Sequence, residues 1–409
     1  MDVFFDQLGR TVLEQWKREN FSLVKFPEIA RSTLDARPPA QYIDLSALMR
    51  DFLLSDDQPF QTDSEFGEPE LVAYSHPRFY VQLLFWMDGT TAIHQHEFSG
   101  AFHVMHGSSI HAHYAFEQPK PVTPYLRVGD LKMKGIELLE AGRTVPIVSG
   151  DQAIHSLFHL DSPSVTVVVR TQHDPGTGPQ FNYLPPHVAF DPHFSDKLTM
   201  RRKQLLDVLA RAGDPGYGEV VLEMIAGMDF ERGFSILHHS MEYLQQFGEW
   251  ETVLRTFEKK HGALAAGVAA TLKEDDRRSV IKSLRYTTVE PEHRFFLALL
   301  MNAPTREDLL ALVAQRFPEE EPVAIVLRWV EELTEVSDQG VAILDASFPE
   351  TLEVGPEAQP ELFLSAFRYL FNRDMELLPA MRDLTAADIE ELRRVFARSS
   401  LSLLTSEVP

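Results

Sequence analysis

Two histidines separated by a single residue constrain this chain more than any other feature of its sequence. They are His94 and His96, within the stretch GTTAIHQHEFSGAFHVMHGSSIHAH that covers residues 89–113. Because successive side chains of a β-strand point to opposite faces, both imidazoles project from one face if this segment is a strand. The stretch predicts three short antiparallel strands joined by tight turns, with the histidine pair on the first.

His155, in the later run SGDQAIHSLFH, is the expected third ligand. Two imidazoles from one strand and a third from a strand distant in sequence give a three-nitrogen set on one side of a cation. Such a set leaves positions open for dioxygen and a substrate. The pattern therefore predicts a mononuclear metal site, formed by His94, His96 and His155, in a small β-barrel.

The composition narrows the class of protein. At 409 residues the chain is long for one domain, and two or more are expected. The formal net charge of −23 argues against nucleic acid and anionic membrane surfaces as partners. The chain has no cysteine, which excludes disulfides, thiolate zinc sites and cysteine nucleophiles. Neither a signal peptide pattern nor a membrane-spanning apolar run is present, so we expect a cytoplasmic protein.

The pattern of hydrophobic residues and turn residues changes twice along the chain, which predicts an α+β multidomain protein. Residues 1–70 combine helical spacing with several prolines and predict a helical cap on a barrel. Residues 71–194 consist of short runs rich in Val, Tyr, Phe and Thr, the pattern of a sandwich or closed barrel. The predicted strands are Phe79–Trp86, Thr91–Glu97, Ala101–His106, Ile110–Phe116, Val122–Val128, Thr144–Val148, Ser156–Leu160 and Val165–Thr171.

Residues 195–409 show helical spacing throughout and predict an all-α, helical-repeat-like domain of stacked helix pairs. Thr305 is expected to begin a helix, because it starts a Thr-x-x-Asp signal, and Thr385 is expected to open the last clear helix. No fixed repeat period is present. The segment Val336–Pro360 is rich in Pro, Gly and Glu and predicts a loop.

The barrel segment resembles the cupin superfamily. The first cupin motif is a glycine, then H-x-H, a glutamate and a glycine, and the second motif ends in histidine. The matching residues are Gly89, His94, His96 and Gly107 in the first motif and Gly142, Pro146, Gly150 and His155 in the second. The glutamate is missing, since residues 99–101 are Ser, Gly and Ala. The resemblance implies a jelly-roll barrel with three neutral ligands.

A cupin with three histidines and no glutamate looks most like the thiol dioxygenases, the cysteine-dioxygenase-like group. The likeness covers only the barrel core and runs along FYVQLLFW, AIHQH, HGSS and AIHSLFHLDSPSVTVVV. It implies a site that holds iron(II) and binds a thiol or amine together with dioxygen. Some members carry a Cys–Tyr crosslink near the metal. Here Ala101 stands at the cysteine position and the tyrosine position falls near Arg170, so that crosslink cannot form.

Three neutral imidazoles leave a bound divalent cation with its full charge, which favours anionic co-ligands. Iron(II) is preferred over zinc because a hydrolytic zinc site also needs a general base, and no carboxylate accompanies the trio. The same imidazoles would also accept manganese, nickel, copper or zinc.

Further residues are candidates for catalysis. His103 shares strand parity with Ala101 and is expected to face the cavity. Tyr114 is a candidate hydroxyl donor near dioxygen, with a place in the core as its alternative. Arg170 is a candidate fork for a substrate carboxylate, with a surface ion pair as its alternative.

Three more histidines have two open interpretations each. His111 and His113 form a second H-x-H, which either lines the pocket as proton donors or faces solvent. His159 lies four residues after His155 and would share its face on a strand. It is either a fourth ligand or a contact behind the ligands.

Three functions compete at this point. The first is an iron(II) oxygenase that acts on a small thiol, amino acid or related anion with dioxygen. The second is an oxygenase that modifies a peptide or a carrier-bound residue held by the helical domain. The third is a non-catalytic metal-binding cupin, which acts as a sensor or interaction protein. The sequence determines neither the substrate nor the oligomeric state.

Overall fold

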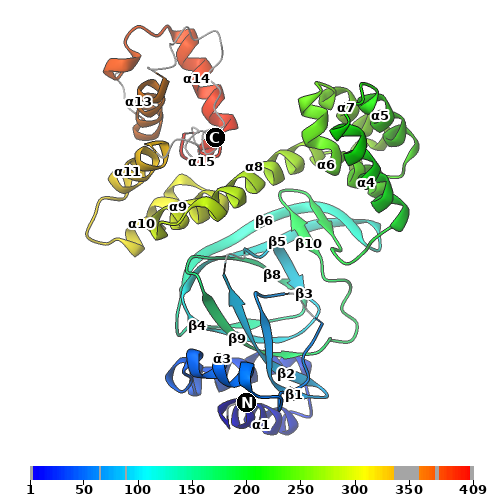
Figure 1. Ribbon diagram of the computed structural model, residues 1–409, viewed down its shortest axis with the longest axis vertical. Helices are drawn as coiled ribbons and strands as arrows, with labels where there is room; N and C mark the ends of the chain where they lie inside the picture. Colours follow the sequence, from blue (N-terminus) through cyan, green and yellow to red (C-terminus); the bar gives the residue numbers. More distant parts are fainter. Residues whose placement is uncertain (1–2, 64–65, 88–89, 336–358, 374–376, 406–409) are drawn as a thin grey trace.

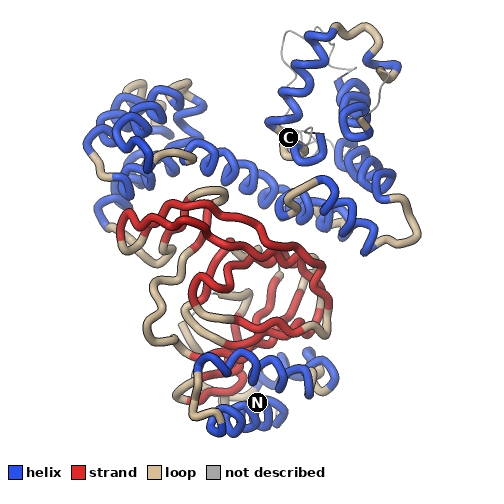
Figure 2. The backbone as a smooth tube through the Cα atoms, turned by 180° about the vertical axis from the view of Figure 1, so that it is seen from behind, coloured by secondary structure: helices blue, strands red, loops and turns tan. Residues whose placement is uncertain are grey.

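The computed structural model describes residues 3–63, 66–87, 90–335, 359–373 and 377–405. Strands occupy the middle of the molecule, with three N-terminal helices on one side and the remaining helices on the other (Figures 1 and 2). The chain is an α+β protein with several separate cores, as the sequence predicts.

The N-terminal helices pack against a five-stranded sheet. They are α1 (Val3–Arg18), α2 (Phe26–Ala36) and α3 (Leu45–Leu54), with short 3-10 turns at Leu23–Lys25 and Pro39–Gln41. Phe5, Leu8 and Trp16 of α1 are buried at helical spacing, and they share a core with Phe79 and Val81 of the sheet. Burial of this apolar stripe is what holds the helices on the outer face of the sheet.

The five-stranded sheet has the order β1-β2-β9-β4-β7. Its strands are β1 (Glu70–His76), β2 (Phe79–Trp86), β9 (Ser164–Thr171), β4 (Gly100–His106) and β7 (Thr144–Ile147). All pairs are antiparallel. Strands β2, β4 and β9 are buried along nearly their whole length, because helices cover one face and a second layer of strands covers the other.

The second layer is a closed barrel of order β10-β11-β6-β5-β8-β3. Its strands are β3 (Ile93–His96), β5 (Ser108–Thr123), β6 (Leu126–Glu140), β8 (Gly150–His159), β10 (Asn182–Leu184) and β11 (Val188–Phe190). An apolar cluster with members from both layers, including Leu84, Phe102, Leu139 and Leu157, fills the space between them.

The predicted strand set is correct in outline and wrong in several places. Strands β3, β4 and β5 do not form a meander, since β3 pairs with β8 and β10, β4 with β7 and β9, and β5 with β6 and β8. The predicted strand Val122–Val128 straddles the turn between β5 and β6, which is the longest hairpin of the described chain. The predicted set also lacks β1, β10 and β11.

The helices beyond the barrel form two groups joined by the long helix α8 (Figure 1). The first group is α4 (Lys197–Arg211), α5 (Tyr217–Gly227), α6 (Phe230–Gln246) and α7 (Trp250–His261), followed by a 3-10 turn at Gly262–Leu264 and α8 (Val268–Thr287). The second group is α9 (Pro291–Asn302), α10 (Arg306–Arg316), α11 (Pro322–Glu335), α13 (Gln359–Asn372), α14 (Ala386–Arg398) and α15 (Ser402–Thr405), with a 3-10 turn at Pro379–Met381.

Two predicted helix starts are confirmed by their caps. The hydroxyl of Thr305 accepts from the backbone N–H of Asp308, and Thr385 forms a complete capping box with Asp388. The predicted loop Val336–Pro360 lies outside the described residues, apart from the start of α13 at Gln359.

Both helical groups share a core with the barrel wall. Ile110, Leu138 and Phe158 of β5, β6 and β8 belong to the core of α8–α15. Leu126 and Val128 of β6 belong to the core of α4–α8. The hairpin β5–β6 is therefore a wall with the barrel interior on one side and the helices on the other. Within the described residues, no helix combines the length and apolarity needed to cross a bilayer.

Candidate metal centre

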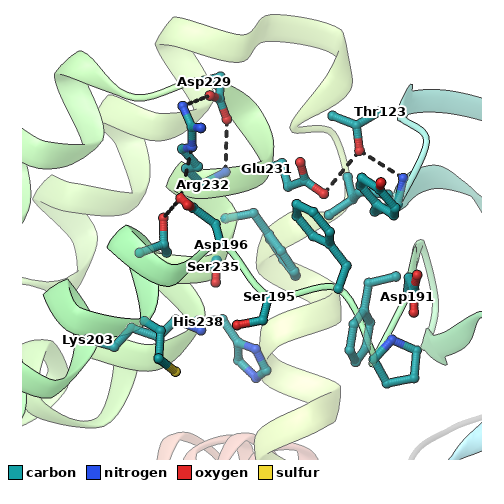
Figure 3. Close-up of a pocket in the computed structure, with 18 of the residues that line it drawn as sticks. Thr123, Asp191, Ser195, Asp196, Lys203, Asp229, Glu231, Arg232, Ser235 and His238 are labelled. Atoms are coloured by element: carbon teal, nitrogen blue, oxygen red, sulfur yellow. Dashed lines mark hydrogen bonds and ion pairs between the residues drawn. The ribbon is translucent and has the colours of Figure 1, made fainter.

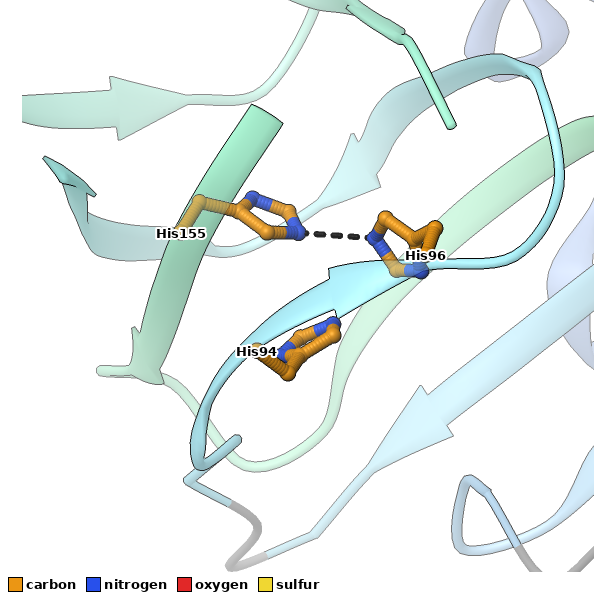
Figure 4. A group of neighbouring side chains, drawn as sticks. All are labelled: His94, His96 and His155. Atoms are coloured by element: carbon orange, nitrogen blue, oxygen red, sulfur yellow. Dashed lines mark hydrogen bonds between the residues drawn. The ribbon is translucent and has the colours of Figure 1, made fainter. Parts of the chain in front are cut away.

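The structure brings the three predicted ligands together. His94 and His96 come from β3 and His155 from the neighbouring strand β8, where His94 and His155 are register partners (Figure 4). All three side chains are buried. The alternation of β3 aims His94 and His96 to one side, and the antiparallel pairing adds His155 to the same side.

The ring nitrogens are close enough to share one cation. Nε2 of His96 lies 2.8 Å from Nε2 of His155, and the ring of His94 stands 4.6 Å and 4.8 Å from the other two by centroid. One nitrogen from each ring falls within 4.8 Å of the others. Two nitrogens at right angles around a cation, each about 2.1 Å from it, are separated by about 3 Å. The donor set therefore fits a first-row divalent metal.

Burial keeps the three imidazoles neutral, with lone pairs available. It lowers the pKa of His94 to about 4 and lowers the pKa of His96 and of His155 well below the usual value. Nδ1 of His94 lies 2.8 Å from the carbonyl oxygen of Ala92, which only accepts, so this nitrogen carries the proton. Nε2 of His94 then presents a lone pair and has no hydrogen-bond partner, as a metal-binding nitrogen requires.

The triad faces a small cavity, of about 30 Å³, between the sheet and the barrel. Its described lining contains no carboxylate and is mostly apolar: Phe66, Gln82, Leu84, Trp86, Thr91, His94, His96, Phe98, Phe102, Ile147, His155, Leu157, Thr166 and Val168. A hydrolytic site normally adds a general base to its metal, and this lining supplies none.

A chain of hydrogen bonds supports His155 from behind. Its Nδ1 lies 2.9 Å from Nε2 of His111, whose Nδ1 lies 3.3 Å from Oε1 of Glu137. If Nε2 of His155 binds a cation, the proton of His155 must sit on Nδ1 and is donated to His111, which in turn donates from Nδ1 to Glu137. The contact with His111, together with the weaker effect of His113, lowers the pKa of Glu137 to about 2, so that carboxylate is ionised at neutral pH. Carboxylate–histidine contacts of this kind fix the tautomer and ring orientation of metal ligands.

His111, His113 and Glu137 are themselves spaced like a metal site. Nε2 of His113 lies 3.5 Å from Oε1 of Glu137, and Arg143 lies 3.5 Å from its other oxygen. A cation on Nδ1 of His111 would, however, displace the proton that this nitrogen donates to Glu137. The proton of His111 would then sit on Nε2 and point at the proton on Nδ1 of His155, so that neither nitrogen could accept a hydrogen bond from the other. The positions of these protons therefore favour His111 and Glu137 as hydrogen-bond partners that orient His155, and not as metal ligands.

His103 does not face the cavity, contrary to the prediction. Phe102 lines the cavity, so its neighbours on β4 point to the opposite face, where Ala101 packs with α1 and α2. Nδ1 of His103 lies 2.8 Å from the hydroxyl of Thr144 on the adjacent strand. The structure does not bring His103 to the triad, and a catalytic role for it stays a prediction.

Tyr114 and Arg170 are also outside the described lining of the cavity. Tyr114 packs with Ile93, Phe181 and Tyr183. The guanidinium of Arg170 lies over the ring of Phe98, 3.4 Å from its centroid, and donates to the carbonyl oxygens of Thr171 and Gln172. Phe98 thus stands between Arg170 and the cavity, and the catalytic roles proposed for both residues stay predictions.

His159 lies behind the cavity wall. Its ring stacks on that of Trp86 at 4.6 Å between centroids, and its Nδ1 lies 3.0 Å from the hydroxyl of Ser109. Burial lowers the pKa of His159 to about 3. His159 thus contacts the cavity lining at Trp86, and its role beside the ligands stays a prediction.

Sequence reasoning missed two residues of this centre. Gln82 lines the cavity, is 1% exposed, and its Oε1 has no partner. Its signal is that it is the only polar residue with a hydrogen-bonding amide within FYVQLLFW. Glu137, which supports His111, comes from an ordinary polar strand and left no signal in the sequence.

Comparisons with known proteins do not assign this centre to a family. Models of known families give no match, and neither do curated proteins. Among solved structures, the chain matches TT1209 from Thermus thermophilus at 19% identity, over 25% of this chain and 80% of that one, with a TM-score of 0.18. It also matches a hydroquinone 1,2-dioxygenase, PnpCD, solved with Cd2+ and 4-hydroxybenzonitrile, at 15% identity, over 26% of this chain and 64% of that one, with a TM-score of 0.20. Scores this low carry no argument about activity.

Proposed function

We propose that this protein is a non-haem iron(II)-dependent oxygenase that uses dioxygen on a small thiol, amino acid or related anion. The observation that carries the proposal is the convergence of three neutral, buried imidazoles on a cavity whose described lining has no carboxylate. Three imidazoles suit iron among other first-row metals and leave the far side of the cation open.

The residues of the chain divide the work of such a site. His94, His96 and His155 would hold the metal through Nε2, and iron(II), when bound, supplies the electrons that activate dioxygen. His111 and Glu137 hold the ring of His155 with its Nε2 toward the cavity. The apolar walls exclude water from the reacting groups, which limits their loss to hydrolysis and proton leakage.

The size of the cavity bears on how a substrate enters. About 30 Å³ is far below the roughly 300–1,000 Å³ of typical small-molecule pockets. An amino acid therefore has to displace side chains of the lining. Phe66 stands at the rim, 38% exposed, with its ring 5.3 Å from that of Trp86 and 5.9 Å from that of His94. We infer that the substrate enters past Phe66.

The test is metal analysis of protein purified without oxygen, followed by oxygen-uptake assays with small thiols and amino acids. We expect iron to be retained and at least one thiol or amino acid to stimulate oxygen consumption. Protein that holds no first-row metal, even after anaerobic loading with iron(II), would refute the proposal.

A non-catalytic metal protein is the second candidate, and the small volume of the cavity is the observation that favours it. In that case the loaded protein binds metal at the triad but consumes no oxygen with any substrate. Substitution of Phe66 by Ala separates the two functions. It should raise the apparent affinity or turnover for a substrate of an oxygenase, and it should leave a sensor inactive towards oxygen.

A further inference from the structure

A second cavity, of about 790 Å³, lies outside the barrel, where the turn of the β5–β6 hairpin and β11 meet α4 and α6 (Figure 3). Its volume falls within the range of small-molecule sites, which often form where two structural units meet. None of the triad residues lines it.

One part of the wall is apolar and aromatic. The rings of Tyr125 and Phe194 stack face to face, 3.8 Å apart with an interplanar angle of 6°. Both rings are more than a third exposed, although each is a large apolar group. Leu126, Leu184 and Phe234 extend this surface into the cavity. Exposed aromatic surface beside a cavity is what an apolar ligand body would cover.

The carboxylates of the wall already have partners. Glu231 accepts from the hydroxyl of Thr123 at 3.0 Å. Asp196 accepts from Thr199 at 2.6 Å and from Arg232 at 3.2 Å. Arg232 also pairs with Asp229 at 3.3 Å. Figure 3 shows these contacts at the upper side of the cavity.

Lys203 is different, because no carboxylate of the described chain pairs with its ammonium group. Burial lowers the pKa of Lys203, and no nearby acid opposes this effect. That is unusual in a chain with 61 acidic residues. Lys203 lines the lower side of the cavity together with Ser195 and His238 (Figure 3). A half-buried cation with no counter-charge is a natural partner for an anionic ligand.

We propose that this cavity binds a small organic anion, with its carboxylate, sulfonate or phosphate group at Lys203 and its aromatic or aliphatic body against Tyr125 and Phe194. The proposal is independent of the metal centre and of the oxygenase activity. It assigns to the contact between barrel and helices a binding role that the triad does not need.

Two fluorescent probes with the same body test the proposal in the full-length, metal-loaded protein. Anilinonaphthalene sulfonate carries an anionic group, and phenylnaphthylamine lacks it. The wild-type protein should bind the sulfonate with one site per chain and at least about tenfold more tightly than the neutral probe, as expected for a charge-assisted contact.

Four variants localise the contact. Lys203→Met should abolish the preference for the sulfonate but keep the affinity for the neutral probe, and Lys203→Arg should restore the preference. Lys273→Met, which removes an exposed lysine of α8 that does not line the cavity, should change neither. Phe194→Ala should weaken both probes alike, since it removes part of the surface that the shared body covers.

Each remaining outcome counts against the proposal. If the preference survives in Lys203→Met, or if Lys273→Met removes it equally, the anion does not bind at Lys203. Binding at several sites per chain would show adsorption to exposed apolar surface. Because iron content and oxygen uptake are measured separately, failure here leaves the proposed oxygenase activity untouched.

Discussion

The barrel carries two H-x-H pairs on strands that flank β8, and the positions of the protons favour only the first pair as part of the ligand set. His94 and His96 face an apolar cavity, and Nε2 of His94 has no partner. His111 and His113 instead face Glu137, which is partly exposed and also meets Arg143. The same pattern thus gives a ligand set where polar partners are absent, and a support for that set where a carboxylate is present.

The largest difference between the two pairs should appear in metal content. His94→Ala removes one of three ligands and should lower metal affinity by more than the roughly 10–100-fold that loss of an outer partner costs. His113→Ala should leave the metal content unchanged, because the ring of His113 contacts Glu137 and His111 rather than any of the three ligands. Metal analysis after anaerobic loading with iron(II) measures both. Equal metal loss in the two variants would contradict the distinction between the pairs.

His94 and Glu137 should also contribute to the free energy of unfolding in different ranges of pH. His94 has a folded-state pKa of about 4, below the usual 6.5, so between these values the unfolded state binds more protons. Stability of the metal-free protein is therefore complete above about pH 6.5 and is lost as the pH falls towards 4, by about 3 kcal/mol for His94 alone. Glu137 has a pKa of about 2, below the usual 4.5, so its contribution is present above about pH 4.5 and is lost only below it.

Urea unfolding of the metal-free protein at pH 7, 5 and 4 checks these ranges. His94→Leu should reduce the slope between pH 6.5 and 4 without removing it, because burial also lowers the pKa of His96 and of His155. A wild-type protein whose unfolding free energy is constant between pH 7 and 4 would show that the triad is not buried in its neutral form.

Loss of the carboxylate behind His111 should have a smaller effect than loss of a ligand. Glu137→Gln leaves the triad in place but removes the anion that fixes the tautomer of His111, and we expect metal affinity to fall about 10–100-fold. Nitrogen NMR of labelled histidines should show that the Nδ1–H tautomer of His111 is no longer dominant. Glu140→Gln, on the same strand and exposed, is the matched control. An unchanged affinity in Glu137→Gln would show that the hydrogen-bond chain does not orient His155.

The smallest expected effect concerns Gln82, which has no counterpart near the second pair. Its buried Oε1 lacks a partner, a situation that costs on the order of 1–3 kcal/mol. Gln82→Leu should therefore stabilise the metal-free protein by about 1 kcal/mol, measured by thermal unfolding. The same variant should consume oxygen more slowly if the amide contacts a bound substrate. A destabilised variant would mean that the amide has a structural role.

The sequence predicts the ligands of the centre better than their surroundings. Strand alternation suffices to put His94 and His96 on one face, and the later His155 follows from its distance along the chain. The face of His103 was not predictable, because both sides of β4 are buried, one by α2 and one by the cavity. In such a strand the apolar pattern does not distinguish inside from outside.

The contact between Glu137 and His111 could not be predicted from the sequence for a different reason. Glu137 meets His111 only through the register of the long β5–β6 hairpin, which contains three irregularities. A shift of one residue would turn Glu137 to the other face. The turn at residues 124–125 was itself missed, since the sequence around it reads as a continuous strand. Register and turn position depend on tertiary pairing, and the local sequence does not specify them here.

Strands β5 and β6 belong to the barrel and also to the cores of both helical groups. The barrel half of this molecule is therefore not an independent domain. A fragment cut at residue 194 would leave Ile110, Leu138 and Phe158 in water on one flank and Leu126, Val128 and Val188 on the other. Such a fragment would self-associate rather than remain a monomer. A transfer of the three-imidazole centre to another scaffold therefore requires either keeping the apolar outer face of the hairpin or redesigning that face with polar side chains.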